Sequence, residues 1–171
     1  MSDNGVHRYN GIVAWSGSTG AGYANYDRSH QGWAPPCAAR LSLSADAAFR
    51  GDPTKLNPEQ LLVLAAASCQ LLSFIAVAAR AHVDVLDYRD ECIGLMPEKD
   101  PPMRVTEITL RPRIRVRGAS EETVRALVEQ AHDECFIANS LRSKVVLEPS
   151  IEVVGSGAAA PDGTQAAQPA M

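Results

Sequence analysis

The chain has 171 residues, a formal net charge of −4 at pH 7, and 46% hydrophobic but only 5% aromatic residues. This length suits one domain with a hydrophobic core of its own. The acidic balance and the few aromatic rings argue against binding to nucleic acid or to anionic membranes. The opening stretch MSDNGVHRYN lacks the apolar segment of a secretory signal, so we expect a cytoplasmic location.

Short strand-like runs alternate with turns through residues 7–49. YNGIVAW and AARLSLSADAAF are predicted strands, since they combine β-forming residues with an alternating apolar pattern. The glycine- and serine-rich stretch SGSTGAG is predicted to be a turn, and residues 33–36 a loop.

A long helix is predicted to follow. Asn57 stands where an N-cap is expected, Pro58 at the first helical position and Glu59 in the first turn, and the helix should run to about Ala81. Its apolar part approaches the roughly 20 residues of a membrane span. Serine, glutamine and many alanines interrupt the large apolar side chains, which favours a buried core helix. A helix apolar on nearly every side needs more cover than one sheet gives, so we expect a homodimer.

Two strand regions, a second helix and a last strand complete the ordered part of the chain. The helix has Ser120 as its N-cap and an apolar stripe along one face. This order predicts an α+β fold with antiparallel sheets, a long central helix and a shorter second helix. We expect one domain over residues 1–154 and a disordered tail over residues 155–171, where small and polar residues dominate. The predicted strands are VDVLDYRDECIGLM, RVTEITLRPRIRVRG and VVLEPSIEVV.

One strand segment, RPRIRVR, places its arginines on one face. A nucleic-acid-binding stripe would have this form. The net negative charge of the chain favours a solvated edge strand instead, and Pro112 also indicates an edge. The four residues are Arg111, Arg113, Arg115 and Arg117.

Four cysteines, Cys37, Cys69, Cys92 and Cys135, are spread along the chain without a CxxC pair or the spacing of a small secreted disulfide framework. We therefore expect free thiols. Cys69 lies in the middle of the apolar helix, where a cysteine is either a small buried hydrophobe or a nucleophile in a polar pocket. His132 and Cys135 stand one helical turn apart, but a second such pair is missing, so metal binding is the weakest option and we predict no metal.

Glu59 and Cys69 lie on the same predicted helix. Ten helical residues advance roughly 15 Å, so these two side chains cannot meet within one chain. Two copies of the helix, packed antiparallel about a two-fold axis near Leu64, would bring residue 59 of one copy opposite residue 69 of the other. A site shared across a homodimer is the simplest way to join the two groups.

Three segments resemble a known family. NPEQLL at 57–62, the small-residue run into ASC at 67–69, and HDECFIANS at 132–140 are similar to the signature segments of the OsmC/Ohr family of thiol peroxidases. The resemblance runs from His7 to Val154. Many organic hydroperoxide reductases have proline after the second cysteine and this chain has Phe136, so it resembles an OsmC-like side branch.

The resemblance implies an OsmC-like fold in an intertwined homodimer with active sites at the interface. It implies that Cys69 attacks an organic hydroperoxide and that Cys135 resolves the resulting sulfenic acid as an intramolecular disulfide, which an external dithiol reductant reopens. No cofactor is expected. The general chemistry agrees, because a thiolate is the reactive nucleophile and an apolar pocket suits an alkyl or acyl hydroperoxide.

The family also implies an arginine, held by Glu59, that stabilises the thiolate. We favour Arg28 in NYDRSH, because it can arrive from a mobile loop, and keep Arg50 in FRGDP as the alternative. Either arginine could instead be an ordinary surface charge.

A second class of function fits the same fold. In it, a non-catalytic OsmC-fold protein binds a lipid-like apolar ligand in the dimer-interface cleft, and the thiols are incidental. The substitution Cys69→Ser separates the two, because an enzyme loses hydroperoxide turnover whereas a binding protein keeps its ligand affinity. Cys37 has no assigned role, and Cys92 is expected to be structural.

Overall fold

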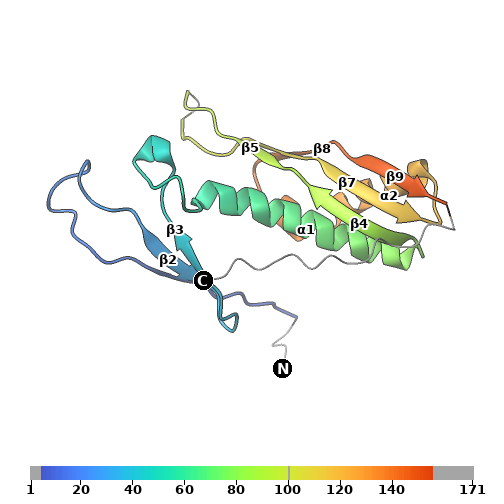
Figure 1. The fold of residues 1–171 in the computed structure, drawn as a ribbon, viewed down its shortest axis with the longest axis horizontal. Coiled ribbons are helices and arrows are strands. Elements are labelled where there is room, and N and C mark those ends of the chain that lie inside the picture. Colours follow the sequence, from blue (N-terminus) through green and yellow to red (C-terminus); the bar gives the residue numbers. More distant parts are fainter. Residues whose placement is uncertain (1–4, 100, 156–171) are drawn as a thin grey trace. The chain divides into compact units, whose positions relative to one another are not determined.

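The computed structural model describes residues 5–99 and 101–155 (Figure 1). Contacts within the chain divide it into two compact units, residues 1–62 and 63–171. The tail predicted to be disordered lies, beyond Gly155, outside the described residues.

The first unit contains a three-stranded antiparallel sheet in the order β1-β2-β3. The outer two strands fall within predicted strands. The middle strand was not predicted from the sequence, because HQGW shows no alternating pattern and contains a glycine. A long connection, which carries Arg28, joins the first two strands. The strands are β1 (Ile12–Ala14), β2 (His30–Trp33) and β3 (Arg40–Leu43).

A short 3-10 helix, η1 (Ala47–Phe49), follows the sheet. Asp46 begins it by accepting a hydrogen bond from Ala48 N, and Arg50 ends it in the left-handed conformation at φ 65°. Gly51 then lies against the preceding turn, where an added Cβ would stand 1.7 Å from the carbonyl oxygen of Ala45. Only glycine fits here, which explains the RGDP stretch in structural terms.

Helix α1 (Pro58–Arg80) begins as predicted and ends one residue before the predicted end. Asn57 Oδ1 accepts from Gln60 N at 2.8 Å, and Gln60 Oε1 accepts from Asn57 N at 3.0 Å. This reciprocal pair is a capping box. By length and composition α1 could cross a membrane, and 33% of its most apolar window is buried within the chain.

The second unit contains two three-stranded sheets. Each long strand predicted from the sequence is broken into two shorter strands, one in each sheet. The first sheet is β4 (Asp84–Asp90), β7 (Pro112–Arg117) and β9 (Ser150–Val154), and the second is β5 (Ile93–Leu95), β6 (Glu107–Leu110) and β8 (Lys144–Leu147).

The sheets of the second unit are mixed, which corrects the prediction of purely antiparallel pairing. β4 pairs antiparallel with β7, and β5 with β6, but β6–β8 and β7–β9 are parallel. The cause is the helical segment between β7 and β8, because a crossover of this length returns the chain in the parallel direction.

The arginine-rich strand β7 is the middle strand of its sheet, so the prediction of an edge strand is wrong. Pro112 is its first residue, a position that proline tolerates. On the outer face, Arg113 lies 3.7 Å from Glu91 and Arg117 lies 3.5 Å from Asp84. Arg111 stands between β6 and β7 and pairs with Glu148 at 2.7 Å. Neighbouring acids therefore neutralise much of the stripe.

Helix α2 (Glu121–Asp133) is capped by Ser120 as predicted, since the Ser120 hydroxyl accepts from Thr123 N at 3.1 Å. A short helix, α3 (Phe136–Ser140), follows. Side chains of α1, α2, β7 and the residue before β4 form the core of this unit: Phe74, Val77, Ala78, Val83, Ile114, Val116, Val124, Val128 and Ala131.

Candidate active site

The second unit brings together the two cysteines predicted to react. Cys69 lies in the middle of α1, and Cys135 is the N-cap of α3. Ile137 N donates to Cys69 Sγ at 3.4 Å, and Ala138 N donates to Cys135 Sγ at 3.5 Å. Two consecutive backbone amides of one turn thus donate hydrogen bonds to two sulfur atoms, whose residues are 66 positions apart in the sequence. Both cysteines are free thiols.

Packing between α1 and α2 sets this arrangement. Gln70, next to Cys69, is 1% exposed, and its Nε2 donates to the carbonyl oxygen of Val128 at 3.1 Å. Val128 lies two helical turns before Cys135. Asn139 Nδ2 also donates to Cys135 O at 3.1 Å, which fixes the turn that enters α3. One buried and one partly buried polar contact therefore hold the helices near the thiols.

The two thiols differ in environment. Cys135 is 1% exposed, and its burial raises the pKa of the thiol, while the amide of Ala138 opposes this shift and the neighbouring Cys69 adds to it. Cys135 is therefore protonated at neutral pH. Cys69 is half-buried and lines a cavity. Cys69 is thus accessible to a ligand in the cavity, whereas Cys135 is buried.

The cavity beside Cys69 has a volume of about 520 Å³. Apolar side chains of α1 and α3 form much of its wall, among them Leu72, Ala76 and Phe136, and Phe136 is 80% exposed. At the far end of α1, Arg80 and Glu134 also line the cavity and form an ion pair of 2.5 Å. The space suits a mainly apolar ligand with limited polar character.

The first unit brings together the other two predicted groups, Arg28 and Glu59. Both line a cavity of about 440 Å³, together with Trp15, Phe49 and other residues. Arg28 donates to the carbonyl oxygens of Tyr26, at 2.9 Å, and Tyr23, at 2.7 Å. Its guanidinium also lies 4.1 Å and 4.7 Å from the ring centroids of Tyr26 and Tyr23. In all of these contacts the guanidinium of Arg28 is held by residues of the loop that carries it.

The alternative arginine is placed differently. Arg50 is exposed and does not line the cavity that Arg28 and Glu59 share. Arg28 shares a cavity lining with Glu59 and Arg50 does not, and the pairing of Glu59 with either arginine stays a prediction. The action of Arg28 on Cys69 also remains a prediction.

A further polar group lies near Cys135, and the sequence did not indicate it. Burial raises the pKa of Tyr88, and Asp90, Cys92 and Cys135 raise it further. Burial also raises the pKa values of Asp90 and of the Cys92 thiol. Cys92 is half-buried, whereas Cys37 is exposed. The proximity of Tyr88 to Cys135 has no signal in the sequence, since it arises from the packing of β4 against the helices.

Metal binding was the weakest option from the sequence. Cys135 N donates to His132 O at 3.1 Å, as expected for residues one turn apart. Over residues 5–99 and 101–155, no group of three or more histidine, cysteine, aspartate or glutamate side chains gathers in a way that could hold a metal ion.

Known proteins resemble the chain in sequence and in fold. The family model described as OsmC-like protein matches residues 51–150. An OsmC-like protein of unknown function from Vibrio cholerae is 26% identical, with a TM-score of 0.75, and the match covers 85% of this chain and 100% of that one. No curated protein matches the chain.

Two solved structures with more specific names share the fold at lower identity. An organic hydroperoxide resistance protein from Legionella pneumophila is 17% identical, with a TM-score of 0.64 over 88% of this chain and 100% of that one. The organic hydroperoxide resistance protein OhrB of Bacillus subtilis is also 17% identical, with a TM-score of 0.57 over 85% and 98%.

Proposed function

Because the chain belongs to the OsmC-like protein family, we propose that it is a thiol-dependent peroxidase that reduces organic hydroperoxides in the cytoplasm. Cys69 is the nucleophile and Cys135 the resolving thiol. One observation carries the proposal: Ile137 N and Ala138 N, on one turn, donate to the two sulfur atoms, of which one lines a cavity and the other is buried.

The reaction balances in three steps. The Cys69 thiolate attacks the terminal oxygen of the hydroperoxide, the O–O bond breaks, and the alcohol leaves after taking up a proton, while Cys69 becomes a sulfenic acid. Cys135 then loses its proton and attacks the Cys69 sulfur, so that a disulfide forms and water leaves. An external dithiol reduces this disulfide and is itself oxidised to a disulfide. No cofactor takes part.

The surroundings of Cys69 support an organic substrate. Leu72, Ala76 and Phe136 present apolar surface beside the thiol. An alkyl or acyl hydroperoxide gains from burying its chain there, whereas hydrogen peroxide has no apolar part to bury.

Arg28 is the cation of the proposed site, and Glu59 orients it. The two line one cavity of the first unit, and the Tyr26 ring and two carbonyl oxygens already keep the guanidinium in a fixed place. A guanidinium can stabilise both a thiolate and the negative charge that develops on the leaving oxygen.

A homodimer completes the proposal. The face of α1 opposite the core exposes large apolar side chains, with Leu64 at 55%, Leu72 at 59% and Ile75 at 39%. A second copy of the chain covers this face and creates the interface site. Sedimentation of the intact protein tests this point: a dimer is expected, and a monomer that turns over hydroperoxide contradicts it.

The experiment for the function compares the protein with its Cys69→Ser variant. Wild-type protein should consume cumene hydroperoxide with dithiothreitol as reductant, and Cys69→Ser should abolish this turnover. Cys37→Ser is the matched control, because Cys37 is exposed and should be dispensable. Turnover that survives in Cys69→Ser would contradict the assignment.

The second candidate is a non-catalytic protein that binds a lipid-like apolar ligand. The exposed Phe136, where many organic hydroperoxide reductases have proline, favours it, because an aromatic side chain enlarges the apolar surface of the cavity. In this case wild-type protein shows no turnover, and Cys69→Ser binds a fluorescent fatty acid as tightly as wild type does.

A further inference from the structure

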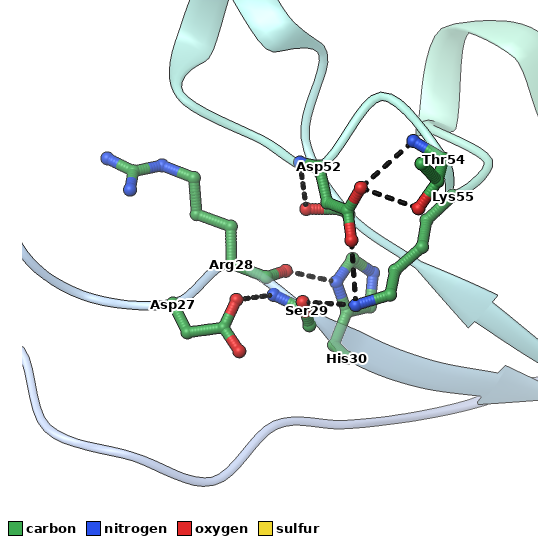
Figure 2. A network of polar contacts seen from close by, with 8 residues as sticks. Asp27, Arg28, Ser29, His30, Asp52, Thr54 and Lys55 are labelled. Carbon is green, nitrogen blue, oxygen red and sulfur yellow. Dashed lines mark hydrogen bonds and ion pairs between the residues drawn. The ribbon is translucent and has the colours of Figure 1, made fainter.

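A polar network in the first unit joins two segments that are distant in the sequence. Lys55 Nζ donates to Ser29 Oγ at 2.6 Å, across 26 positions, and forms an ion pair with Asp52 Oδ2 at 3.2 Å. Figure 2 shows the ammonium group between these two partners, with the Arg28 side chain pointing away from the network. Any influence on Arg28 must therefore act through the backbone.

One end of the network is fixed by the segment that leads into α1. Asp52 Oδ1 accepts from Thr54 Oγ1 at 2.7 Å and from Thr54 N at 2.9 Å. Asp52 N donates to Ser44 Oγ at 3.0 Å, and Ser44 is 1% exposed. The bonds from Thr54 and, to a smaller extent, from Lys55 together lower the pKa of Asp52 to about 2, so the carboxylate is ionised at neutral pH. Lys55 thus has a rigid anionic partner.

The other end fixes the backbone on both sides of Arg28. Ser29 N donates to Asp27 Oδ1 at 2.8 Å, and His30 Nδ1 lies 2.9 Å from the carbonyl oxygen of Arg28 (Figure 2). Ser29, the next residue, is the one that Lys55 holds. The loop is also held by Trp15, next to β1, whose Nε1 donates to Asp27 O at 2.8 Å, and by its own Tyr23 and Tyr26 carbonyls, which accept from Arg28.

We propose that Lys55 is a positioning residue for Arg28, which holds the loop of that arginine at a fixed place relative to the start of α1 and Glu59. The inference rests on the proposed function, in which Arg28 and Glu59 act together at the reacting thiol. Lys55 itself touches neither substrate nor sulfur.

The network is suited to control geometry rather than stability. Partly exposed ion pairs contribute little to folding, and the Lys55 and Asp52 side chains are 27% and 37% exposed. Loss of Lys55 should therefore leave the protein folded and free the loop. Catalysis is more sensitive, since a displacement of about 1 Å can lower a rate about 100-fold.

The test separates the two halves of the reaction. In Lys55→Met, oxidation of reduced protein by one equivalent of cumene hydroperoxide, followed by rapid quenching and mass spectrometry, should be about 10-fold slower than in wild type. Reduction of the preformed disulfide by dithiothreitol should be unchanged, because it does not need Arg28. Lys55→Arg should restore most of the oxidation rate, since arginine can also donate to Ser29 and pair with Asp52.

Two further variants test whether the effect of Lys55→Met comes from its bond to Ser29. Arg125→Met is the matched control, because it removes another surface ion pair, to Glu121 at 2.8 Å, and should change neither rate. Ser29→Ala removes the acceptor and should slow oxidation as Lys55→Met does. The double variant should be no slower than the slower single one, because both changes break the same link.

The results distinguish a failure of the proposed role of Lys55 from a failure of the proposed peroxidase function. Wild-type protein that is not oxidised by the hydroperoxide overturns the proposed function and, with it, the role of Lys55. An active wild type with equally active Lys55→Met overturns the inference alone. Equal slowing of both half-reactions, or additive effects of Ser29→Ala and Lys55→Met, also overturns it, since a general structural role would then explain the loss.

Discussion

Cys135, in the second unit, is 1% exposed and follows a helix that the buried Gln70 ties to α1. Arg28, in the first unit, is half-buried and is held by carbonyl oxygens and rings of its own loop and by a partly exposed polar network. Cys135 is thus buried and Cys69 half-buried between packed helices, whereas the arginine depends on partly exposed contacts. Changes near the thiols should affect both stability and chemistry, and changes near the arginine mainly chemistry.

The largest expected effect concerns the resolving thiol. In the absence of added thiol, Cys135→Ser should still consume one equivalent of hydroperoxide, because Cys69 remains, and the reaction should then stop at the sulfenic acid. Dimedone labelling followed by mass spectrometry should find the label on Cys69. A variant that keeps multiple turnover through an intramolecular disulfide, for instance with Cys92, would show that Cys135 is not the resolving thiol.

A smaller effect, on the free energy of unfolding, is expected at the buried side-chain amide of Gln70, next to Cys69. Gln70→Ala should lower the free energy of unfolding by about 2 kcal/mol, because it removes the donor to Val128 O and leaves a small void. Urea unfolding followed by circular dichroism measures it. Glu129→Ala, an exposed change on α2, should stay within about 0.5 kcal/mol of wild type. Equal stability of Gln70→Ala and wild type would contradict the contrast between the two units.

The smallest effect is expected on the pH dependence of stability, through the polar network of the first unit. Its carboxylate, Asp52, has its pKa lowered from 3.8 to about 2, first by the Thr54 hydroxyl, then by the Thr54 amide, and then by Lys55. Since the folded-state pKa is the lower one, these bonds stabilise the unit above about pH 4 and are lost as the pH falls through about 2.

NMR titration of the Asp52 carboxyl carbon measures this shift. Thr54→Val should raise the pKa of Asp52 more than Lys55→Met does, because the Thr54 hydroxyl has the largest influence. A pKa close to 3.8 in the wild-type protein would mean that the network does not hold the carboxylate.

Several features could be predicted from the sequence because they depend on local signals. The start of α1 follows from Asn57 and Pro58, and the cap of α2 from Ser120. The family prediction, which the NPEQLL and ASC segments supported, is confirmed by the family model. Within the site, the nearness of Cys69 and Cys135 came from the resemblance, since no pattern along the chain joins residues so far apart.

Other features depend on packing between distant segments and were missed. The strands break between two sheets near Arg111 and Pro149, although the sequence pattern continues across both points. Parallel pairing needs the crossover through α2, so alternation alone could not reveal it. The contact of Lys55 with Ser29 has no periodic signature either, because it joins two irregular segments.

The disulfide that forms on oxidation is the most direct test of the proposed mechanism. Reduced wild-type protein is treated with one equivalent of cumene hydroperoxide, free thiols are alkylated, and the peptides are mapped by mass spectrometry. We predict a bond between Cys69 and Cys135 within one chain, with Cys37 and Cys92 alkylated. A stable sulfenic acid on Cys69 with Cys135 still reduced, or no oxidation at either cysteine, would contradict it.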